Sequence, residues 1–313
     1  MDITAVGEIL VDLTQTGNDG SNIGQFAANP GGAPANVAVA AAKLGAKTAF
    51  VGKIGRDAFG LGLKRTLMEN QVDCSGLCED RAVPTSLAVV TVDGTGERSF
   101  SFYRSPGADV MLEKEEIPET LLKMTRFLHF GSVSLTADPA RTATLYAARR
   151  AKELGAILTY DPNYRPALWT SEDLAKAEMR VPLTMVDILK ISDEELELMT
   201  GTTDPAEGAA RMQEKGIRLV LVTLGADGVY YRFGTETGTV PGFSVQVADT
   251  NGAGDTFFGA VLSRLSRRET APWDMTRTEL EDILRFANKA ASITTSRSGA
   301  IPAMPSLNEL QDM

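Results

Sequence analysis

Cysteine and histidine are scarce in this chain of 313 residues, which has two cysteines and one histidine. Cys74 and Cys78 could face one another across a helical turn, but a free reduced pair is favoured over a disulfide or half of a metal site. No apolar run reaches the roughly 18 residues that span a bilayer. The first residues, Met1–Thr4, are acidic and strand-like rather than typical of a signal peptide. We therefore expect a cytoplasmic protein that is not embedded in a membrane.

Positive charge is also in short supply. Lysine and arginine number 31 against 41 aspartates and glutamates, which gives a formal net charge of −10. Nucleic-acid binding needs a cationic face, so this balance argues against a nucleic-acid partner. A local basic cluster can still bind an anionic small molecule. The composition therefore favours a small-molecule ligand.

Repeats, low-complexity tracts and long linkers are absent, and short apolar runs alternate with helical patterns. In one such pattern, Val37, Ala40, Ala41 and Leu44 fall on one helical face. The runs typical of buried strands are Ile3–Gly7, Thr48–Lys53, Arg126–Phe130, Ala156–Tyr160, Val186–Ile191 and Ile217–Thr223. The last third is helical, over Ala253–Arg268 and Arg277–Ser296. This alternation predicts an α/β fold with a mainly parallel central sheet flanked by helices.

One stretch breaks the alternation. Thr85–Val92 and Glu97–Arg104 are typical of two strands joined by the turn residues Asp93–Gly96. Residues 11–30 lack helix signals and could supply further strands. We predict a single domain over residues 1–313, with a small β-sheet lid formed by about 11–30 and 84–109. Pairing of two lids would cover an open sheet edge, so a homodimer is one expectation.

The most informative segment is Asp249–Ala260, which places glycines directly before a helix. Gly252, Ala253 and Gly254 would let backbone N–H groups approach an anion closely, and the helix dipole adds about half a positive charge there. Asp255 would repel a bound phosphate unless its charge has a use. It could accept a proton from a hydroxyl that attacks a phosphoryl group, or it could simply cap the helix.

This segment resembles a known signature. Asp249–Phe257 matches the C-terminal signature Asp-Thr-x-Gly-Ala-Gly-Asp-x-Phe of the ribokinase-like (pfkB) carbohydrate kinases. Gly31–Ala38, before Leu44-Gly45, is similar to the family's N-terminal Gly-Gly signature, and the resemblance extends through Val222–Gly228 and Phe286–Pro302. The chain has no P-loop pattern, and no Gly-x-Gly-x-x-Gly follows its first strand.

The resemblance implies an ATP-dependent sugar kinase with a ribokinase-like fold. Asp255 would be the catalytic base. The charge on the transferring phosphate would be stabilised by Gly252, Ala253 and Gly254. The sugar would rest on Asp12, Gly31, Gly32 and Asn36, and ATP would border Thr223, Gly225 and Asn288. Taken singly, Asp12 could be a turn residue, and Asn288 could face solvent from a long helix.

The resemblance also implies metal sites. Ser192-Asp193-Glu194-Glu195 stands where many relatives carry Asn-x-x-Glu, so Ser192 would lie near ATP and Glu195 would organise Mg²⁺ through water. This acidic run could equally be a solvated first helical turn. Many relatives bind a monovalent cation with backbone carbonyls. The residues that resemble that loop, where K⁺ would bind, are Asp249, Asn251, Thr294, Arg297 and Gly299.

The segment Asp161–Trp169 is similar to fructokinases and 2-keto-3-deoxygluconate kinases, and the overall pattern is most similar to bacterial fructokinases. Arg165 could clamp phosphates or a substrate acid. On the lid, Tyr103 could cover a sugar, while Arg104 could bind a carboxylate or point to solvent. Fructose is the expected substrate. The alternatives are 2-keto-3-deoxygluconate, ribose or a nucleoside, or a non-catalytic sugar-binding protein. His129 is expected in the core.

Overall fold

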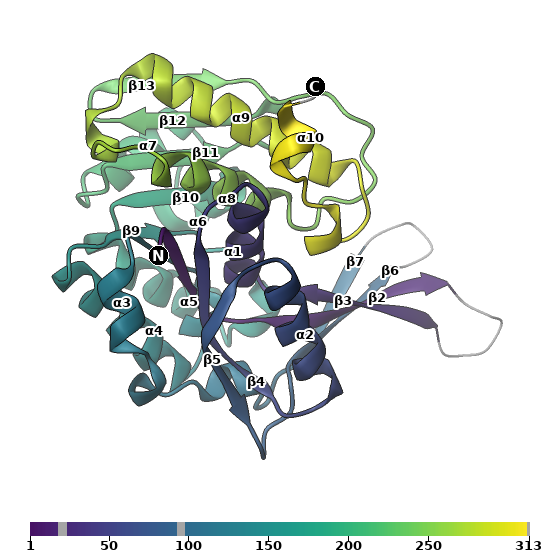
Figure 1. Ribbon diagram of the computed structural model, residues 1–313. Helices are drawn as coiled ribbons and strands as arrows, with labels where there is room; N and C mark the ends of the chain where they lie inside the picture. The colour runs from purple at the N-terminus through teal and green to yellow at the C-terminus, as the bar shows by residue number, and fades with distance from the viewer. Residues whose placement is uncertain (18–23, 93–97, 312–313) are drawn as a thin grey trace.

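The structure, a computed structural model, describes residues 1–17, 24–92 and 98–311. Part of the predicted lid, residues 18–23, and the predicted turn Asp93–Gly96 lie outside the described residues. The described residues form two sheets and the helices that cover the larger one (Figure 1). The described helices include none that is both long and apolar enough to cross a membrane.

The larger sheet has nine strands in the order β13-β12-β11-β10-β9-β8-β1-β4-β5. In chain order they are β1 (Ile3–Val6), β4 (Thr48–Gly55), β5 (Asp73–Asp80), β8 (Phe127–Phe130), β9 (Ile157–Tyr160), β10 (Ile188–Ser192), β11 (Leu219–Thr223), β12 (Val229–Phe233) and β13 (Glu236–Val240). Every neighbouring pair from β5 to β11 is parallel, while β12 and β13 run antiparallel at one edge. The prediction of a mainly parallel sheet is confirmed. It could be made from the sequence because strands buried on both faces need continuous apolar runs.

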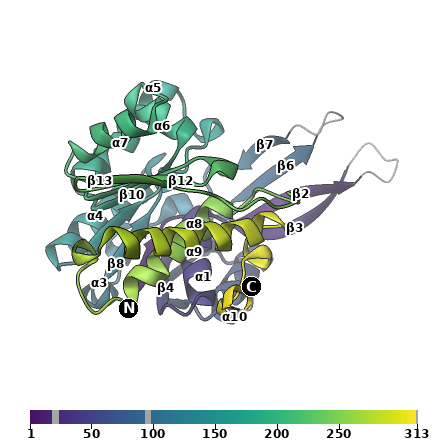
Figure 2. The same ribbon diagram turned by 90° about the horizontal axis from the view of Figure 1, so that it is seen from above.

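Helices cover both faces of this sheet (Figure 2). One layer is built from α1 (Ala33–Lys43), α8 (Ala253–Ser266), α9 (Arg277–Thr295) and α10 (Leu307–Gln311). The other contains α3 (Glu119–Met124), α4 (Ala140–Glu153), α5 (Glu172–Arg180), α6 (Asp193–Thr200) and α7 (Pro205–Gln213), and α2 (Ala58–Glu69) packs beside β4 and β5. The short 3₁₀ turns are Ala108–Met111, Lys114–Glu116, Val133–Leu135, Pro166–Leu168, Val181–Thr184, Gly225–Asp227, Pro272–Asp274 and Ile301–Ala303.

The second sheet has four strands in the order β3-β2-β6-β7 and extends away from the helix-covered body (Figure 1). Its strands are β2 (Leu10–Gly17), β3 (Gln25–Gly31), β6 (Leu87–Val92) and β7 (Arg98–Tyr103). The predicted strands of the 85–104 segment therefore do form, and the 11–30 segment does supply the other two. Antiparallel pairing of β2 with β3 sets Asp12 opposite Asn29 and leads the chain directly into α1.

The scarce residue types lie away from any reactive arrangement. Cys74 and Cys78 are free and lie on β5, so the helical placement considered from the sequence is wrong. Four residues along a strand span about 13 Å, which is too far for a disulfide. His129 is fully buried on β8, as expected, and burial lowers its pKa to about 3.

Candidate active site

The glycine-rich segment begins α8 as the sequence predicted. Gly252 is its N-cap residue and has φ 75°, a left-handed conformation that a side chain would strain. A Cβ atom there would also lie 2.8 Å from the Ala300 side chain. The N–H groups in the first turn of a helix have no partner within the helix and point outward together. The start of α8 is therefore suited to hold an anion.

Asp255 is buried in this first turn, and α1 holds its carboxylate. The Asn36 Nδ2 donates a hydrogen bond of 2.8 Å to the Asp255 Oδ2. Gly259 allows the two helices to meet, because a Cβ there would lie 2.7 Å from that of Ala40. Since Gly252 is the N-cap residue, the interpretation of Asp255 as a helix cap is wrong. The Asn36 Oδ1 is buried without a hydrogen-bond partner, so it is free to bind a ligand.

Burial raises the pKa of Asp255 to about 6. The charge of Asp161 adds to this increase, whereas the Asn36 hydrogen bond and the charges of Lys190 and Arg165 oppose it. The carboxylate is therefore mostly ionised at neutral pH yet close enough to pH 7 to accept a proton. Such a pKa suits a general base.

The predicted sugar residues gather where β2, β3 and α1 meet. A Cβ atom on Gly31 would collide with the Asp12 carboxylate, which shows how closely that carboxylate lies against the backbone. Burial raises the pKa of Asp12 to about 6, while a hydrogen bond with Asn251 and the charge of Arg165 lower it. Gly32, with φ 105°, leaves room for the Glu8 backbone. The structure thus brings Asp12, Gly31, Gly32 and Asn36 together near Asp255.

The lid residues do not all face this region in the same way. The Arg104 Nε donates to the Asp109 Oδ2 at 2.7 Å, and its terminal nitrogens donate to Thr136 and to the Val133 carbonyl. Its side chain is only 5% exposed, so the expectation of a solvent-facing arginine is wrong. Tyr103, by contrast, is 67% exposed. Arg165 is also exposed and donates only to the carbonyl of Tyr164 among the bonds that the structure gives it.

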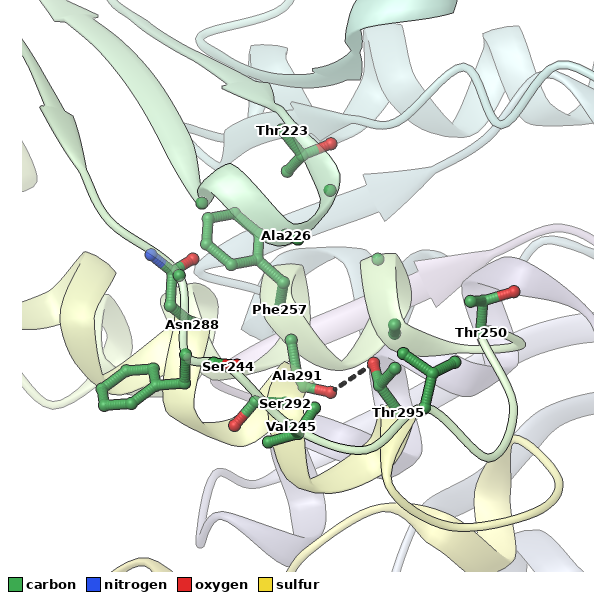
Figure 3. A pocket seen from close by; sticks show the side chains of 17 residues that line it. Thr223, Ala226, Ser244, Val245, Thr250, Phe257, Asn288, Ala291, Ser292 and Thr295 are labelled. Carbon is green, nitrogen blue, oxygen red and sulfur yellow. Dashed lines mark hydrogen bonds between the residues drawn. The ribbon is translucent and has the colours of Figure 1, made fainter.

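A cavity of about 470 Å³ opens beside the start of α8 (Figure 3). Its lining includes Thr223, Gly225 and Asn288, three of the four residues predicted to border ATP, together with Ala253 and Gly254. The Asn288 Nδ2 donates to the carbonyls of Val240 and Pro241 at 3.0 Å, so the side chain faces the sheet edge rather than solvent. The cavity and the anion-binding helix start are therefore continuous.

Sequence reasoning missed the loop that forms one wall of this cavity. Phe243, Val245 and Val247 line it and stay partly exposed. The available signal was the alternation of apolar residues in a segment with no predicted strand. Neighbouring exposed apolar side chains beside a cavity indicate a ligand surface.

Ser192 and Glu195 form a capping box at the start of α6. The Ser192 Oγ accepts from the Glu195 N–H at 3.2 Å, and the Glu195 Oε2 accepts from the Ser192 N–H at 2.9 Å. The Glu195 Oε1 accepts from the Tyr164 N–H at 2.6 Å. The acidic run therefore begins a helix, as one interpretation expected, but Glu195 is buried rather than solvated, and Ser192 does not line the cavity. The described residues contain no group of three acidic, histidine or cysteine side chains that could hold a metal directly.

The predicted cation loop is partly assembled. The Asp249 carboxylate accepts from the N–H groups of Asn251 at 2.9 Å and Gly299 at 3.1 Å, so these two loops are joined. The Thr294 Oγ1 donates to Thr256 at 3.0 Å. The Arg297 side chain pairs with Glu309 at 2.6 Å, so only its backbone could contribute to a cation site.

Sequence reasoning also missed a charged group beneath the helix start. Lys190 and Asp161 form a buried ion pair of 3.0 Å, and Glu8 is buried at the end of β1. The signal was present in the sequence, because Lys190 is a charged residue within an apolar strand, and Glu8 and Asp161 follow the carboxyl ends of two others. In open α/β sheets, ligands bind at that edge.

A mainly parallel sheet with a glycine-rich helix start, a buried carboxylate and a neighbouring cavity is the arrangement expected of a ribokinase-like phosphotransferase. Residues 1–307 match the pfkB family carbohydrate kinases, and the chain belongs to this family. The chain is 42% identical to fructokinase-2 of Solanum lycopersicum over 310 residues, covering 98% of this chain and 94% of that one. The prediction of a sugar kinase that resembles fructokinases is confirmed.

Solved structures agree with this assignment. A fructokinase from Xylella fastidiosa with bound ATP is 34% identical, with a TM-score of 0.92 and coverage of 99% of this chain and 97% of that one. A double mutant of the Vibrio cholerae O395 fructokinase, in a form with bound fructose, ADP and potassium ion, is 36% identical, with a TM-score of 0.90 and the same coverage. The predicted ribokinase-like fold is confirmed.

Proposed function

We propose that this protein transfers the γ-phosphate of ATP to the primary hydroxyl of fructose and releases fructose 6-phosphate. One observation carries the proposal: Asp255 is held by Asn36 directly beside the glycine-rich start of α8, at the edge of the nucleotide-sized cavity. The similarity to fructokinases, two of them with bound nucleotide, supports both substrates.

The chain's own residues would divide the reaction between them. The fructose hydroxyls would bind Asp12, the unpartnered Asn36 Oδ1 and the backbone at Gly31 and Gly32. Asp255 would accept the proton of the attacking hydroxyl as the new O–P bond forms and the bond to the ADP oxygen breaks. The first-turn N–H groups of α8 would stabilise the charge on the transferring phosphoryl group. Arg165, exposed nearby, would bind phosphate oxygens.

Metal ions fit this site to different degrees. Glu195 accepts from backbone N–H groups with both carboxylate oxygens, so it would reach Mg²⁺ only through a water bound to the remaining lone pairs of these oxygens. Mg²⁺ often keeps several waters and binds mainly through substrate phosphates, so the absence of a cage among the described residues is compatible with it. Mg²⁺ would neutralise phosphate charge. K⁺ would sit at the joined 249–251 and 294–299 loops, as the potassium-bound relative supports.

The remaining architecture is part of the same proposal. Residues 1–313 would act as one domain, and the four-stranded sheet would be a lid that closes over the sugar and excludes water. Phe26 and Tyr103 are exposed apolar side chains on its two outer strands, so pairing of two lids would cover them. A cytoplasmic location is consistent with two free cysteines. Size-exclusion chromatography with light scattering tests the dimer.

The test is a coupled ADP-release assay with Mg-ATP and fructose, ribose, adenosine or 2-keto-3-deoxygluconate, with and without K⁺. A clear preference for fructose is expected. Preference for the carboxylate-bearing sugar would overturn the substrate, and it is less expected because Arg104 already pairs with Asp109. No ADP release with any of the four acceptors would favour a non-catalytic sugar-binding protein. The presence of Asp255 argues against that alternative.

A further inference from the structure

A buried ion pair lies directly behind the start of α8. Lys190 is in β10 and Asp161 follows β9, and these parallel neighbours carry both side chains to the same edge of the sheet. The Lys190 Nζ and the Asp161 Oδ2 are 3.0 Å apart, and the side chains are 9% and 1% exposed. A Cβ atom on Gly254 would lie 3.0 Å from the same Nζ. The ammonium group therefore touches the turn that contains Asp255.

Stability alone does not explain this pair. Removing two charges from water costs several kcal/mol per ion, and apolar residues of similar size often serve a core equally well. The Asp161 Oδ2 has the ion pair but no well-aligned hydrogen bond, while the Asp161 Oδ1 accepts from the Asn163 N–H at 3.2 Å. The Asn163 N–H thus holds the Asp161 end of the pair, and the Lys190 ammonium at the other end faces the start of α8.

We propose that the Asp161–Lys190 pair is a positioning element for phosphoryl transfer, in which Lys190 braces the first turn of α8 and the two opposed charges together set the protonation state of Asp255. This inference rests on the proposed role of Asp255 as the base. Neither residue needs to touch the substrate for the effect, because both charges act through the buried carboxylate beside them.

The charges that face Asp255 come from each neighbouring element. Asn36 of α1 is a neutral donor, Lys190 of β10 and Arg165 are positive, and Asp161 is negative. Burial and Asp161 raise the pKa of Asp255, and the other three lower it. Burial by itself would lower the pKa of Lys190, but Asp161, Glu195 and Asp255 together raise it, so the ammonium persists throughout the working pH range.

The test measures kcat/KM for fructose as a function of pH at saturating Mg-ATP. The informative part is the acid limb, where activity falls as the pH is lowered. Asp161→Asn removes only the negative charge and keeps the shape of the side chain. We expect the limb to move to lower pH by about 1 unit, so that activity at pH 5, normalised to pH 8, is roughly five-fold that of the wild type. Adding Lys190→Met to Asp161→Asn should move the limb back up by a similar amount, because the remaining positive charge is then lost.

Controls separate this effect from a loss of structure. Asp80→Asn removes one carboxylate from the Lys53 ion pair, several strands away on β5, and should leave the limb unmoved. As a single substitution, Lys190→Arg keeps the positive charge and should leave the acid limb at its wild-type position. If Asp161→Asn folds poorly, Asp161→Ser removes the same charge with a smaller side chain. Melting temperatures identify variants that fold.

The outcomes also distinguish this inference from the proposed function. A limb that stays at its wild-type position in Asp161→Asn overturns the inference, provided that Asp255→Asn still lowers turnover by orders of magnitude. Near-wild-type turnover of Asp255→Asn would instead overturn the base itself. A downward shift of the limb in Asp161→Asn that the added Lys190→Met reverses supports both, because a purely structural pair would not move the limb one way and then back.

Discussion

The start of α8 and the four-stranded sheet, which would serve the same proposed reaction, are built in opposite ways. At α8, the polar side chains are buried and held by other side chains, as Asp255 is by Asn36 and Lys190 is by Asp161. On the outer strands of the smaller sheet, Tyr103 and Phe26 are 67% and 39% exposed. Among the described residues, Arg104, which follows β7, connects this sheet to the body through a buried ion pair with Asp109.

This difference indicates which part of the proposed site would be preorganised for the reaction and which part would move. A buried, cross-linked polar network does not need to reorganise when charge develops, so it suits the chemical step. Exposed side chains on a projecting sheet can change position at low cost, so they suit sugar recognition and closure. Substitutions at α8 should therefore lower kcat, whereas substitutions on the smaller sheet should act on KM.

The largest effect is expected from Asp255→Asn, which keeps the side-chain shape but removes the base. Turnover should fall by roughly 10²–10⁴-fold with KM nearly unchanged, because the lost interaction belongs to proton transfer. Steady-state kinetics with fructose and Mg-ATP measure this. Turnover within a few-fold of wild type would contradict this role, since the buried carboxylate held by Asn36 would then not be needed for proton transfer.

Asn36→Ala should be the next most damaging change. It removes a hydrogen bond to a charged carboxylate and the unpartnered Oδ1, so kcat/KM for fructose should fall roughly 10- to 100-fold. The acid limb should also move to higher pH, because the Asn36 hydrogen bond lowers the pKa of Asp255. Asn70→Ala, at the end of α2, is the control and should leave both unchanged. A fall in kcat/KM without a shift of the acid limb would contradict an effect of the Asn36 hydrogen bond on the pKa of Asp255.

On the smaller sheet, Tyr103→Ala should raise KM for fructose by about 5- to 10-fold and leave kcat and KM for ATP almost unchanged. The reason is that an aromatic ring over a sugar contributes about 1 kcal/mol of binding, equally in the ground and transition states. Phe26→Ala, on the opposite edge of the same sheet, is the matched control. Equal effects of both substitutions would indicate that association of the sheets, rather than contact with the sugar, is responsible.

The smallest effect concerns stability at the junction of the two regions. Burial raises the pKa of Glu8 to about 8, Asp109 adds to the increase, and backbone hydrogen bonds and Arg104 oppose it. A raised pKa in the folded state means that the stabilisation is complete below pH 4.5 and is lost as pH rises through 8. Glu8→Gln should therefore flatten the fall in melting temperature between pH 5 and 8.

Thermal unfolding at several pH values checks this, with the exposed Glu214→Gln as the control. Parallel curves for Glu8→Gln and wild type would show that Glu8 is ionised over the whole range. In that case Glu8, between the two regions, would carry a buried charge like those at the start of α8. The difference between the two regions would then be smaller.

Much of the fold and part of the site could be predicted from local sequence patterns. Buried parallel strands require continuous apolar runs, so six of the nine strands of the larger sheet were visible, whereas β5 and the antiparallel edge strands β12 and β13 were not. The glycines before α8 encode a backbone that only a glycine adopts easily, so the anion-binding start was also visible. Glu195 shows the limit, because the same four residues are compatible with a metal contact and with a solvated helical turn, and only the contacts of its two oxygens show that a capping box forms.

The sequence by itself therefore determined the α/β alternation, the helix start at Gly252 and the family. The tertiary structure alone decided which distant residues meet: Asn36 with Asp255 across 219 positions, Lys190 behind Gly254, and Arg104 turned inward onto Asp109. The physical reason is that backbone conformation and burial are set by neighbours along the chain. A hydrogen bond or an ion pair between strands and helices depends on packing, and no local pattern records it.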